Sequence, residues 1–116
     1  MSRQVVKQPS AAEFAAAAET LKLLGDPTRL RVVWALLHGE HSVNDLADHV
    51  GVKPTAVSQH LAKLRLSGLV RTRREGNHIF YVAENEHIER LAAEALLQAD
   101  HRVTGGRHHT TKARIA

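Results

Sequence analysis

The amino-acid sequence predicts a mostly α-helical domain that carries one small β-hairpin. Two short amphipathic segments, residues 42–50 and 54–66, are separated by a tight turn that contains Gly51, which is the pattern of a helix-turn-helix. Two short β-prone runs then flank Glu75-Gly76-Asn77. Gly-Asn is a strong hairpin signal, because both residues tolerate a positive φ. A helix-turn-helix followed by a hairpin is a winged helix-turn-helix.

The N-terminal part is expected to supply an arm and two helices. Residues 1–9 are polar and form the predicted flexible arm. Ser10 and Glu13 have capping-box spacing for a helix that runs to Leu24. Asp26 and Pro27 then begin a second helix that runs to residue 37. The residues expected on its inner face, in the core, are Leu30, Val33, Trp34 and Leu37.

The helix predicted over residues 54–66 is the centre of the chain. Val57, Leu61 and Leu64 recur at the spacing of one buried stripe, and Gly68 supplies the positive φ that ends a helix. Short hydrogen-bonding side chains and cations on the other face are the groups that read DNA base edges and hold phosphates. An ordinary amphipathic surface helix is the simpler alternative. The candidate readers are Thr55, Ser58, Gln59, His60 and Lys63, and the candidate backbone contacts on the hairpin are Arg71, Arg73 and Arg74.

Composition narrows the classes of function. The chain has 116 residues, with 16 Lys and Arg against 12 Asp and Glu, a formal charge of +4. That balance suits a polyanionic partner. The absence of cysteine excludes disulfides, thiolate metal sites and cysteine nucleophiles. No apolar run reaches the length of a membrane span and no signal peptide is recognised, so the expected location is cytoplasmic.

The last predicted helix begins after Asn85 and runs to Val103, which closes a domain over residues 10–103. So small a domain cannot bury all of this helix's apolar stripe alone. The sequence therefore predicts a homodimer in which the last helix packs antiparallel on its copy, with the first helix also in the contact. Residues 104–116 form the predicted flexible, basic, His-containing tail. The stripe consists of Ile88, Leu91, Ala92, Ala95, Leu96 and Ala99.

Four stretches together resemble the ArsR/SmtB family of bacterial metal-sensing repressors. They are Leu24-Gly-Asp-Pro-Thr-Arg-Leu-Arg31, Ser58-Gln-His-Leu-Ala-Lys-Leu-Arg65, Gly68-Leu-Val70 and Gly76-Asn-His-Ile-Phe-Tyr81. The resemblance covers residues 15–103. It implies a dimeric winged-helix DNA-binding regulator that is not an enzyme, bound to double-stranded operator DNA and released from it by metal.

The C-terminal residues are most similar to the nickel- and cobalt-responsive, KmtR-like branch of that family. Residues 84–90, then Ala99-Asp-His101 and the pair His108-His109, carry this similarity. The implied metal ligands are His87, Asp100, His101, His108 and His109. In the zinc-sensing branch two further ligands stand where this chain has Asn85 and Gln98, both poor ligands.

The spacing of His87 and His101 makes a two-chain site possible. They are fourteen residues apart, which is about 320° around a helix and roughly 21 Å along it. One chain therefore cannot bring them to one ion, whereas an antiparallel pair of helices places His87 of one chain opposite His101 of the other. Imidazoles with the Asp100 carboxylate suit octahedral Ni(II) or Co(II), and Zn(II) would prefer a four-ligand tetrahedron.

Three alternatives stay open at this point. His87 and His101 can be solvated helix residues, which makes the chain a winged-helix transcription factor without a functional metal site. The metal can also be Zn(II). A metal-dependent hydrolase is disfavoured, because no nucleophile or buried acid–base pair is placed near the histidines. The remaining five histidines, predicted to have non-metal roles, are His38, His41, His49, His60 and His78.

Overall fold

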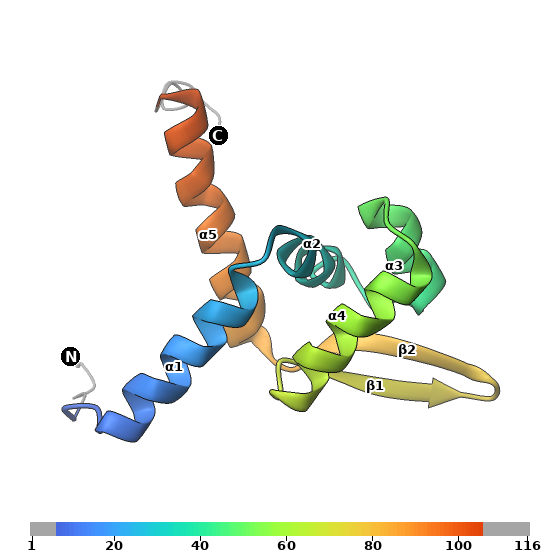
Figure 1. The fold of residues 1–116 in the computed structure, drawn as a ribbon, viewed down its shortest axis with the longest axis horizontal. Coiled ribbons are helices and arrows are strands. Elements are labelled where there is room, and N and C mark those ends of the chain that lie inside the picture. Colours follow the sequence, from blue (N-terminus) through green and yellow to red (C-terminus); the bar gives the residue numbers. More distant parts are fainter. Residues whose placement is uncertain (1–6, 106–116) are drawn as a thin grey trace.

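The computed structural model describes residues 7–105, and it confirms the predicted winged helix-turn-helix (Figure 1). The described residues form five helices and one antiparallel hairpin, and each predicted element is present with its ends shifted by at most a residue or two. The elements are α1 (Ala11–Leu24), α2 (Pro27–Leu36), α3 (Val43–Val50), α4 (Pro54–Leu66), β1 (Val70–Glu75), β2 (His78–Ala83) and α5 (Glu86–Thr104). Most of the predicted arm and nearly all of the predicted tail lie outside the described residues.

Polar side chains fix the N-termini of four helices. At α1 the backbone N–H of Ser10 donates to Glu13 Oε1 at 2.8 Å, and the Glu13 N–H donates to Ser10 Oγ at 3.1 Å, so the predicted capping box is formed. The side chain of Asp26 caps α2, that of Ser42 caps α3 and that of Asn85 caps α5. Each cap satisfies a backbone donor that the helix itself leaves unpaired.

Two glycines in the left-handed conformation shape the helix-turn-helix, one in its turn and one at the end of its second helix. Gly51, with φ 73°, ends α3, and only Gly51–Lys53 separate it from α4. Gly68, with φ 77°, follows α4. The Gly68 N–H donates to Arg65 O at 3.0 Å and the Leu69 N–H to Leu64 O at 2.9 Å, which together form a Schellman motif. This motif turns the chain from α4 directly into β1.

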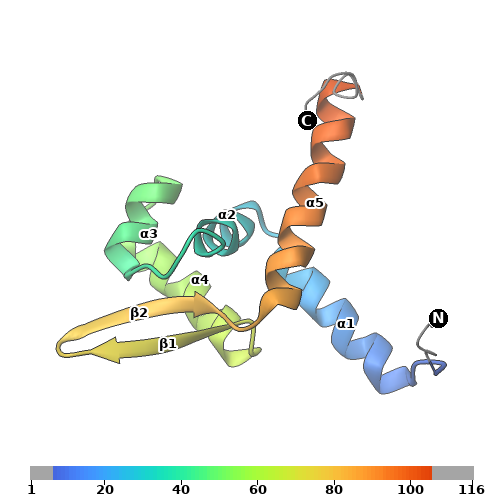
Figure 2. The same cartoon turned by 180° about the vertical axis from the view of Figure 1, so that it is seen from behind.

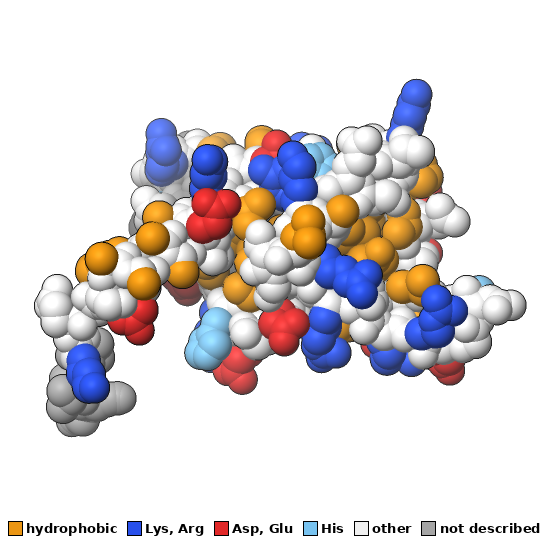
Figure 3. Space-filling view, turned by 60° about the horizontal axis from the view of Figure 1, so that its bottom comes forward, with side chains coloured by type: hydrophobic (Ala, Val, Ile, Leu, Met, Phe, Trp, Pro, Cys, Tyr) orange, Lys and Arg blue, Asp and Glu red, His pale blue; other side chains and the backbone are white. Residues whose placement is uncertain are grey.

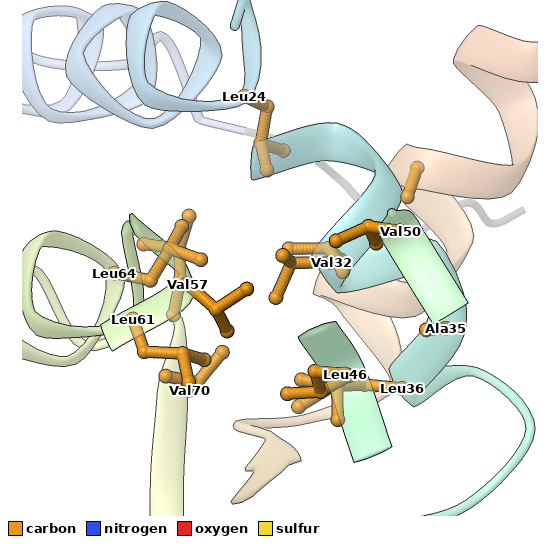
Figure 4. Packing of buried hydrophobic residues seen from close by; sticks show 14 of the residues in the cluster. Leu24, Val32, Ala35, Leu36, Leu46, Val50, Val57, Leu61, Leu64 and Val70 are labelled. Carbon is orange, nitrogen blue, oxygen red and sulfur yellow. The ribbon is translucent and has the colours of Figure 1, made fainter. Parts of the chain in front are cut away.

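The core lies between α2, α3, α4 and the start of the hairpin (Figure 4). Val57, Leu61 and Leu64 of α4 are each fully buried, as predicted. They meet Val32 of α2 and Leu46 of α3, which are also fully buried. Burying side chains of this size typically contributes about 1.5–3 kcal/mol each, so the inward face of α4 is strongly specified.

The prediction that Trp34 belongs to the core is wrong. Its side chain is 47 % exposed. The face of α2 that meets α3 and α4 is filled instead by the smaller Val32, Val33, Ala35 and Leu36. Leu30 and Trp34, one helical turn apart, face α5, where they line an apolar groove of about 460 Å³ together with Pro27, Arg31 and Leu96. Of the four residues predicted for the inner face of α2, only Val33 is buried, because the side of the helix that carries Leu30 and Trp34 faces α5.

The hairpin is tied to the turn between α2 and α3. The Tyr81 N–H donates to His41 O at 2.8 Å, and the His41 N–H donates to Tyr81 O at 3.2 Å. The Arg73 Nε donates to both carboxylate oxygens of Glu40, at 2.9 and 3.1 Å. The Arg73 guanidinium also lies 5.0 Å from the centre of the Phe80 ring. These contacts hold the base and middle of the hairpin in one orientation beside α4.

Helices α1 and α5 project away from the core in both views (Figures 1 and 2). Leu24 is the one buried residue of α1, and Ala92 is the one buried residue of α5. Phe14, Leu21 and Leu97 are all more than half exposed, and hydrophobic side chains run along α1 in the space-filling view (Figure 3). Within residues 7–105, no helix is long and apolar enough to cross a membrane.

The Glu40–Arg73 contact makes the stability of the hairpin depend on pH. Hydrogen bonding from Arg73 lowers the pKa of Glu40 below its ordinary value of 4.5. A carboxylate with a lowered pKa stabilises the fold above its unfolded-state pKa, and this contribution is lost as the pH falls through its folded-state value. We expect Glu40→Gln to be less stable than the wild type at pH 7 and equally stable in acid, as measured by urea unfolding across the pH range. The same change at exposed Glu84, which forms no ion pair with any described residue, should leave the curve unchanged; a constant difference at all pH values would contradict the assignment.

Candidate nucleic-acid interface

The outward face of α4 presents polar and cationic side chains in a regular array. Thr55, Ser58, Gln59 and Lys63 are all exposed, on the side of the helix opposite the buried Val57. Pro54 at the first helical position begins α4 without losing a needed N–H. An α-helix fits the major groove of B-DNA, where side chains of these types distinguish the base pairs. Four of the five predicted readers are therefore available to a duplex.

His60, the fifth predicted reader, is placed differently. Its side chain is 24 % exposed, and its Nδ1 lies 3.4 Å from Arg29 Nη1 and 3.9 Å from Asp26 Oδ2. The hydrogen bond from the Arg29 backbone N–H lowers the pKa of Asp26 most, and the charge of Arg29 lowers it further against the opposing effect of burial. One ring nitrogen of His60 thus faces its own fold rather than solvent.

The three predicted backbone-binding arginines lie along β1, where all are exposed. Because side chains alternate along a strand, Arg71 and Arg73 share one face and Arg74 points to the other. Arg73 is neutralised locally by Glu40 and by Glu75, whose Oε1 lies 3.1 Å from Arg73 Nη1. Both carboxylates raise the pKa of Arg73. Arg74 makes no ion pair with any residue the structure describes.

The structure adds Tyr81 as a candidate that the sequence alone did not indicate, and it places Tyr81 beside Arg65 on the polar face of α4. A hollow of about 470 Å³ between α4 and β2 is lined by Ser58, Ala62, Arg65, Leu66 and Tyr81. It sets the Arg65 and Tyr81 side chains beside the predicted reader Ser58, a combination of donors that can hold a phosphate. The spacing of Ser58, Ala62 and Arg65 along one helix face was visible in the sequence. Their proximity to Tyr81 was not, because it depends on how the hairpin packs.

The three predicted metal ligands on α5 are all accessible, and one chain does not bring the two histidines together. His87 and His101 are exposed, and so is Asp100. His87 Nδ1 lies 3.2 Å from Arg90 Nη2, and Arg90 also pairs with Glu86 at 2.7 Å. Across residues 7–105 of a single chain, no group of three or more His, Asp or Glu side chains is arranged to hold a metal ion.

The other two predicted ligands, His108 and His109, lie outside the described residues. A metal site shared between two chains stays a prediction. Its donors are imidazole and carboxylate groups, with no thiolate anywhere in the sequence. Such a set suits Ni(II), Co(II) or Zn(II).

Comparison with known proteins supports the same fold and a regulatory role. Residues 26–72 match the family model described as "Bacterial regulatory protein, arsR family". The HTH-type transcriptional regulator KmtR of Mycobacterium tuberculosis is 51% identical over 92 residues, which are 78% of this chain and 71% of that protein. The HTH-type transcriptional regulator NmtR of the same organism is 38% identical over 84 residues, 72% of this chain and 70% of the relative.

A solved structure extends the match to nearly the whole fold. The homodimeric winged helix-turn-helix DNA-binding domain Mb0332 of Mycobacterium bovis, described as a possible ArsR-family transcriptional regulator, superimposes with a TM-score of 0.76 at 31% identity. The match covers 93% of this chain and 100% of that domain. These relatives are transcriptional regulators and not enzymes, in agreement with the sequence-based prediction. The chain belongs to the arsR family of bacterial regulatory proteins.

Proposed function

We propose that the chain is a homodimeric, metal-responsive repressor that binds double-stranded operator DNA through α4 and is released from it by Ni(II) or Co(II). The observation that carries the DNA-binding part is the exposed polar face of α4 over a fully buried stripe, next to a basic hairpin. In this arrangement Thr55, Ser58, Gln59 and Lys63 reach the base edges. The arginines of β1 contact the phosphate backbone.

The dimer is supported by the apolar side chains that one chain leaves exposed on α1 and α5. Phe14 and Leu21 of α1 and Leu97 of α5 are large apolar side chains that a monomer leaves more than half exposed to water, and covering them in a dimer is favourable. The Mb0332 domain of the same fold is a homodimer. A two-fold dimer would present two copies of α4, and helix-turn-helix dimers read half-sites about 34–36 Å apart.

The metal assignment rests on the donors of α5 and on the resemblance of residues 84–109 to the nickel- and cobalt-responsive branch. His87 and His101 share a face of α5, while the buried Ala92 lies about 140° around the helix from His87. That face is therefore open to a second chain. His108 and His109 would add imidazoles and Asp100 a carboxylate, a set that matches octahedral Ni(II) or Co(II) better than tetrahedral Zn(II).

Metal binding would act on DNA through the dimer. If the ion prefers one relative orientation of the two chains, it also prefers one spacing of the two α4 helices. The coupling is then reciprocal, so that DNA must weaken metal binding by the same factor by which metal weakens DNA binding. The alternative function, a winged-helix regulator without a functional metal site, predicts no such coupling.

The division of roles between α4 and β1 can be tested on a duplex selected by the wild-type protein from a randomised library. Gln59→Ala should lose about 1–3 kcal/mol of discrimination at one base pair, because a base-edge contact is removed. Arg74→Ala should weaken all sequences alike and reduce the slope of affinity against salt by about 1, because one phosphate contact is lost. Fluorescence anisotropy on single-base variants measures both. An equal loss of sequence preference in the two variants would refute the division.

The dimer contact can be tested at Leu97, which is 56 % exposed in one chain. Leu97→Glu should leave the monomer fold intact and abolish the dimer, because the carboxylate would be buried without a partner. The same change at Leu66, 89 % exposed at the end of α4, is the matched control and should remain dimeric. Sedimentation equilibrium reports both states. A dimeric Leu97→Glu variant would show that α5 packs elsewhere.

The two-chain metal site predicts complementation between two defective subunits. His87→Ala and His101→Ala homodimers should each lose both Ni(II) sites. A purified heterodimer of the two variants places both defects at one site and leaves the other site with an intact His87 and an intact His101. Ni(II) titration should therefore find about half of the wild-type capacity, an expectation that follows from the two-fold symmetry of the interface.

Two other results would each contradict the shared site. No rescue in the heterodimer would indicate a site within one chain, since neither chain then holds both histidines. Unchanged binding in both single variants would remove α5 from the site and leave the tail histidines as the ligands. A Zn(II) titration of the same proteins, with coordination number read from X-ray absorption, separates the octahedral from the tetrahedral assignment.

A further inference from the structure

Three side chains connect helices that are far apart in the sequence. Asp26 stands between α1 and α2, Arg29 lies in the first turn of α2, and His60 lies in the middle of α4. His60 Nδ1 is 3.4 Å from Arg29 Nη1 and 3.9 Å from Asp26 Oδ2. The cluster therefore joins the DNA-reading helix to the N-terminus of α2.

Arg29 also holds the end of α1. Its Nε donates to the carbonyl oxygen of Leu23 at 2.7 Å, in the last turn of α1. Its backbone N–H donates to Asp26 Oδ2 at 2.9 Å, in the cap of α2. One guanidinium thus contacts α1 through Nε and α4 through Nη1. Because α1 is otherwise exposed apart from its end, this is one of the few links between α1 and the rest of the fold.

The geometry restricts what His60 can do. Arg29 keeps its charge and can only donate, so His60 Nδ1 must accept when the two are hydrogen-bonded. This assigns the ring proton of a neutral His60 to Nε2. The nitrogen that faces Arg29 is then not available to a base edge. Burial of the apolar stripe decides which side of α4 faces inwards, and the Arg29–His60 contact, which has a preferred direction, adds a second constraint on the exact rotation of the helix about its own axis.

We propose that His60 is a positioning residue, which sets the orientation of α4 on α2 and, through Arg29, links it to the end of α1. This rests on the proposed function, because it assigns a role in DNA binding to a side chain that does not itself read a base. A change in the tilt of α1 moves the Leu23 carbonyl, and Arg29 passes that movement to His60. The helix that the dimer covers and the helix that enters DNA are then connected by one side chain.

A positioning residue and a base-reading residue give different binding profiles. His60→Leu should weaken the wild-type-selected duplex and each of its single-base variants by the same factor, roughly tenfold, the scale of one hydrogen bond to a charged group. His60→Gln, whose amide oxygen can accept from Arg29, should recover most of the affinity. His38→Leu, the same change at an exposed histidine outside the cluster, is the control and should bind as the wild type does.

Coupling to Arg29 is measured by a double-mutant cycle. Arg29→Met keeps the aliphatic stem and removes both side-chain contacts. The loss in the Arg29→Met, His60→Leu double variant should be close to that of one single variant, because both changes break the same contact. If the fold-loss in affinity of the double variant equals the product of the two single fold-losses, the residues act independently. If His60→Leu alone changes the preference at one base pair, His60 reads a base.

The link to α1 has a readout that needs no DNA. His60→Leu should increase amide hydrogen exchange in the last turn of α1, because Arg29 loses one of its anchors, while His60→Gln should not. Unchanged exchange there in a folded His60→Leu variant would overturn the link. If the wild type selects no sequence from the library, the proposed function fails, whereas the exchange experiment still decides whether the cluster ties α1 to α4.

Discussion

The structure depends on the burial of one stripe of α4. Val57, Leu61 and Leu64 are fully covered by α2, α3 and the start of the hairpin. At about 1.5–3 kcal/mol each, their burial fixes which side of α4 faces inwards. The polar side chains of the other face are outward for that reason alone. A single packing constraint thus converts a sequence pattern into a surface that can enter a DNA groove.

Fewer of the cationic side chains on β1 are free to bind DNA phosphates than the sequence suggests. Arg73 counts as one of three cations on β1, yet Glu40 and Glu75 already neutralise it, and Phe80 lies under its guanidinium. The same side chain holds the hairpin to the turn after α2. If Arg73 exchanged Glu40 for a phosphate, the hairpin would lose its side-chain link to that turn and keep only the backbone pairing of His41 with Tyr81. Phosphate binding by Arg73 therefore competes with its role in holding the hairpin. A count of arginines cannot describe this opposition.

The sequence predicted what depends on near neighbours and failed where distant elements meet. The predicted helix starts at Ser10 and Asp26 depend on local contacts, and both caps are confirmed. Trp34 was placed in the core because its helical period was clear, but the period does not say which neighbouring helix the stripe faces. The contact of His60 with Arg29 joins residues 31 positions apart. No periodicity could reveal it. The proposed pairing of His87 with His101 depends on a second chain and stays a prediction.

The exposed apolar side chains of α1 and α5 connect dimerisation with the orientation of the DNA-reading helix α4. Phe14, Leu21 and Leu97 are costly to leave in water, so dimerisation is favoured by the same effect that folds the core. Helix α1 has few contacts with the rest of its own chain, whereas Ile88, Leu91 and Ala92 in the first half of α5 pack on the core. The positions of α1 and of the second half of α5 are therefore set largely by the partner. A ligand that binds across the dimer can then shift α1 without disturbing the core. Arg29, which touches both the end of α1 and His60, supplies the route by which such a shift reaches the DNA-reading helix.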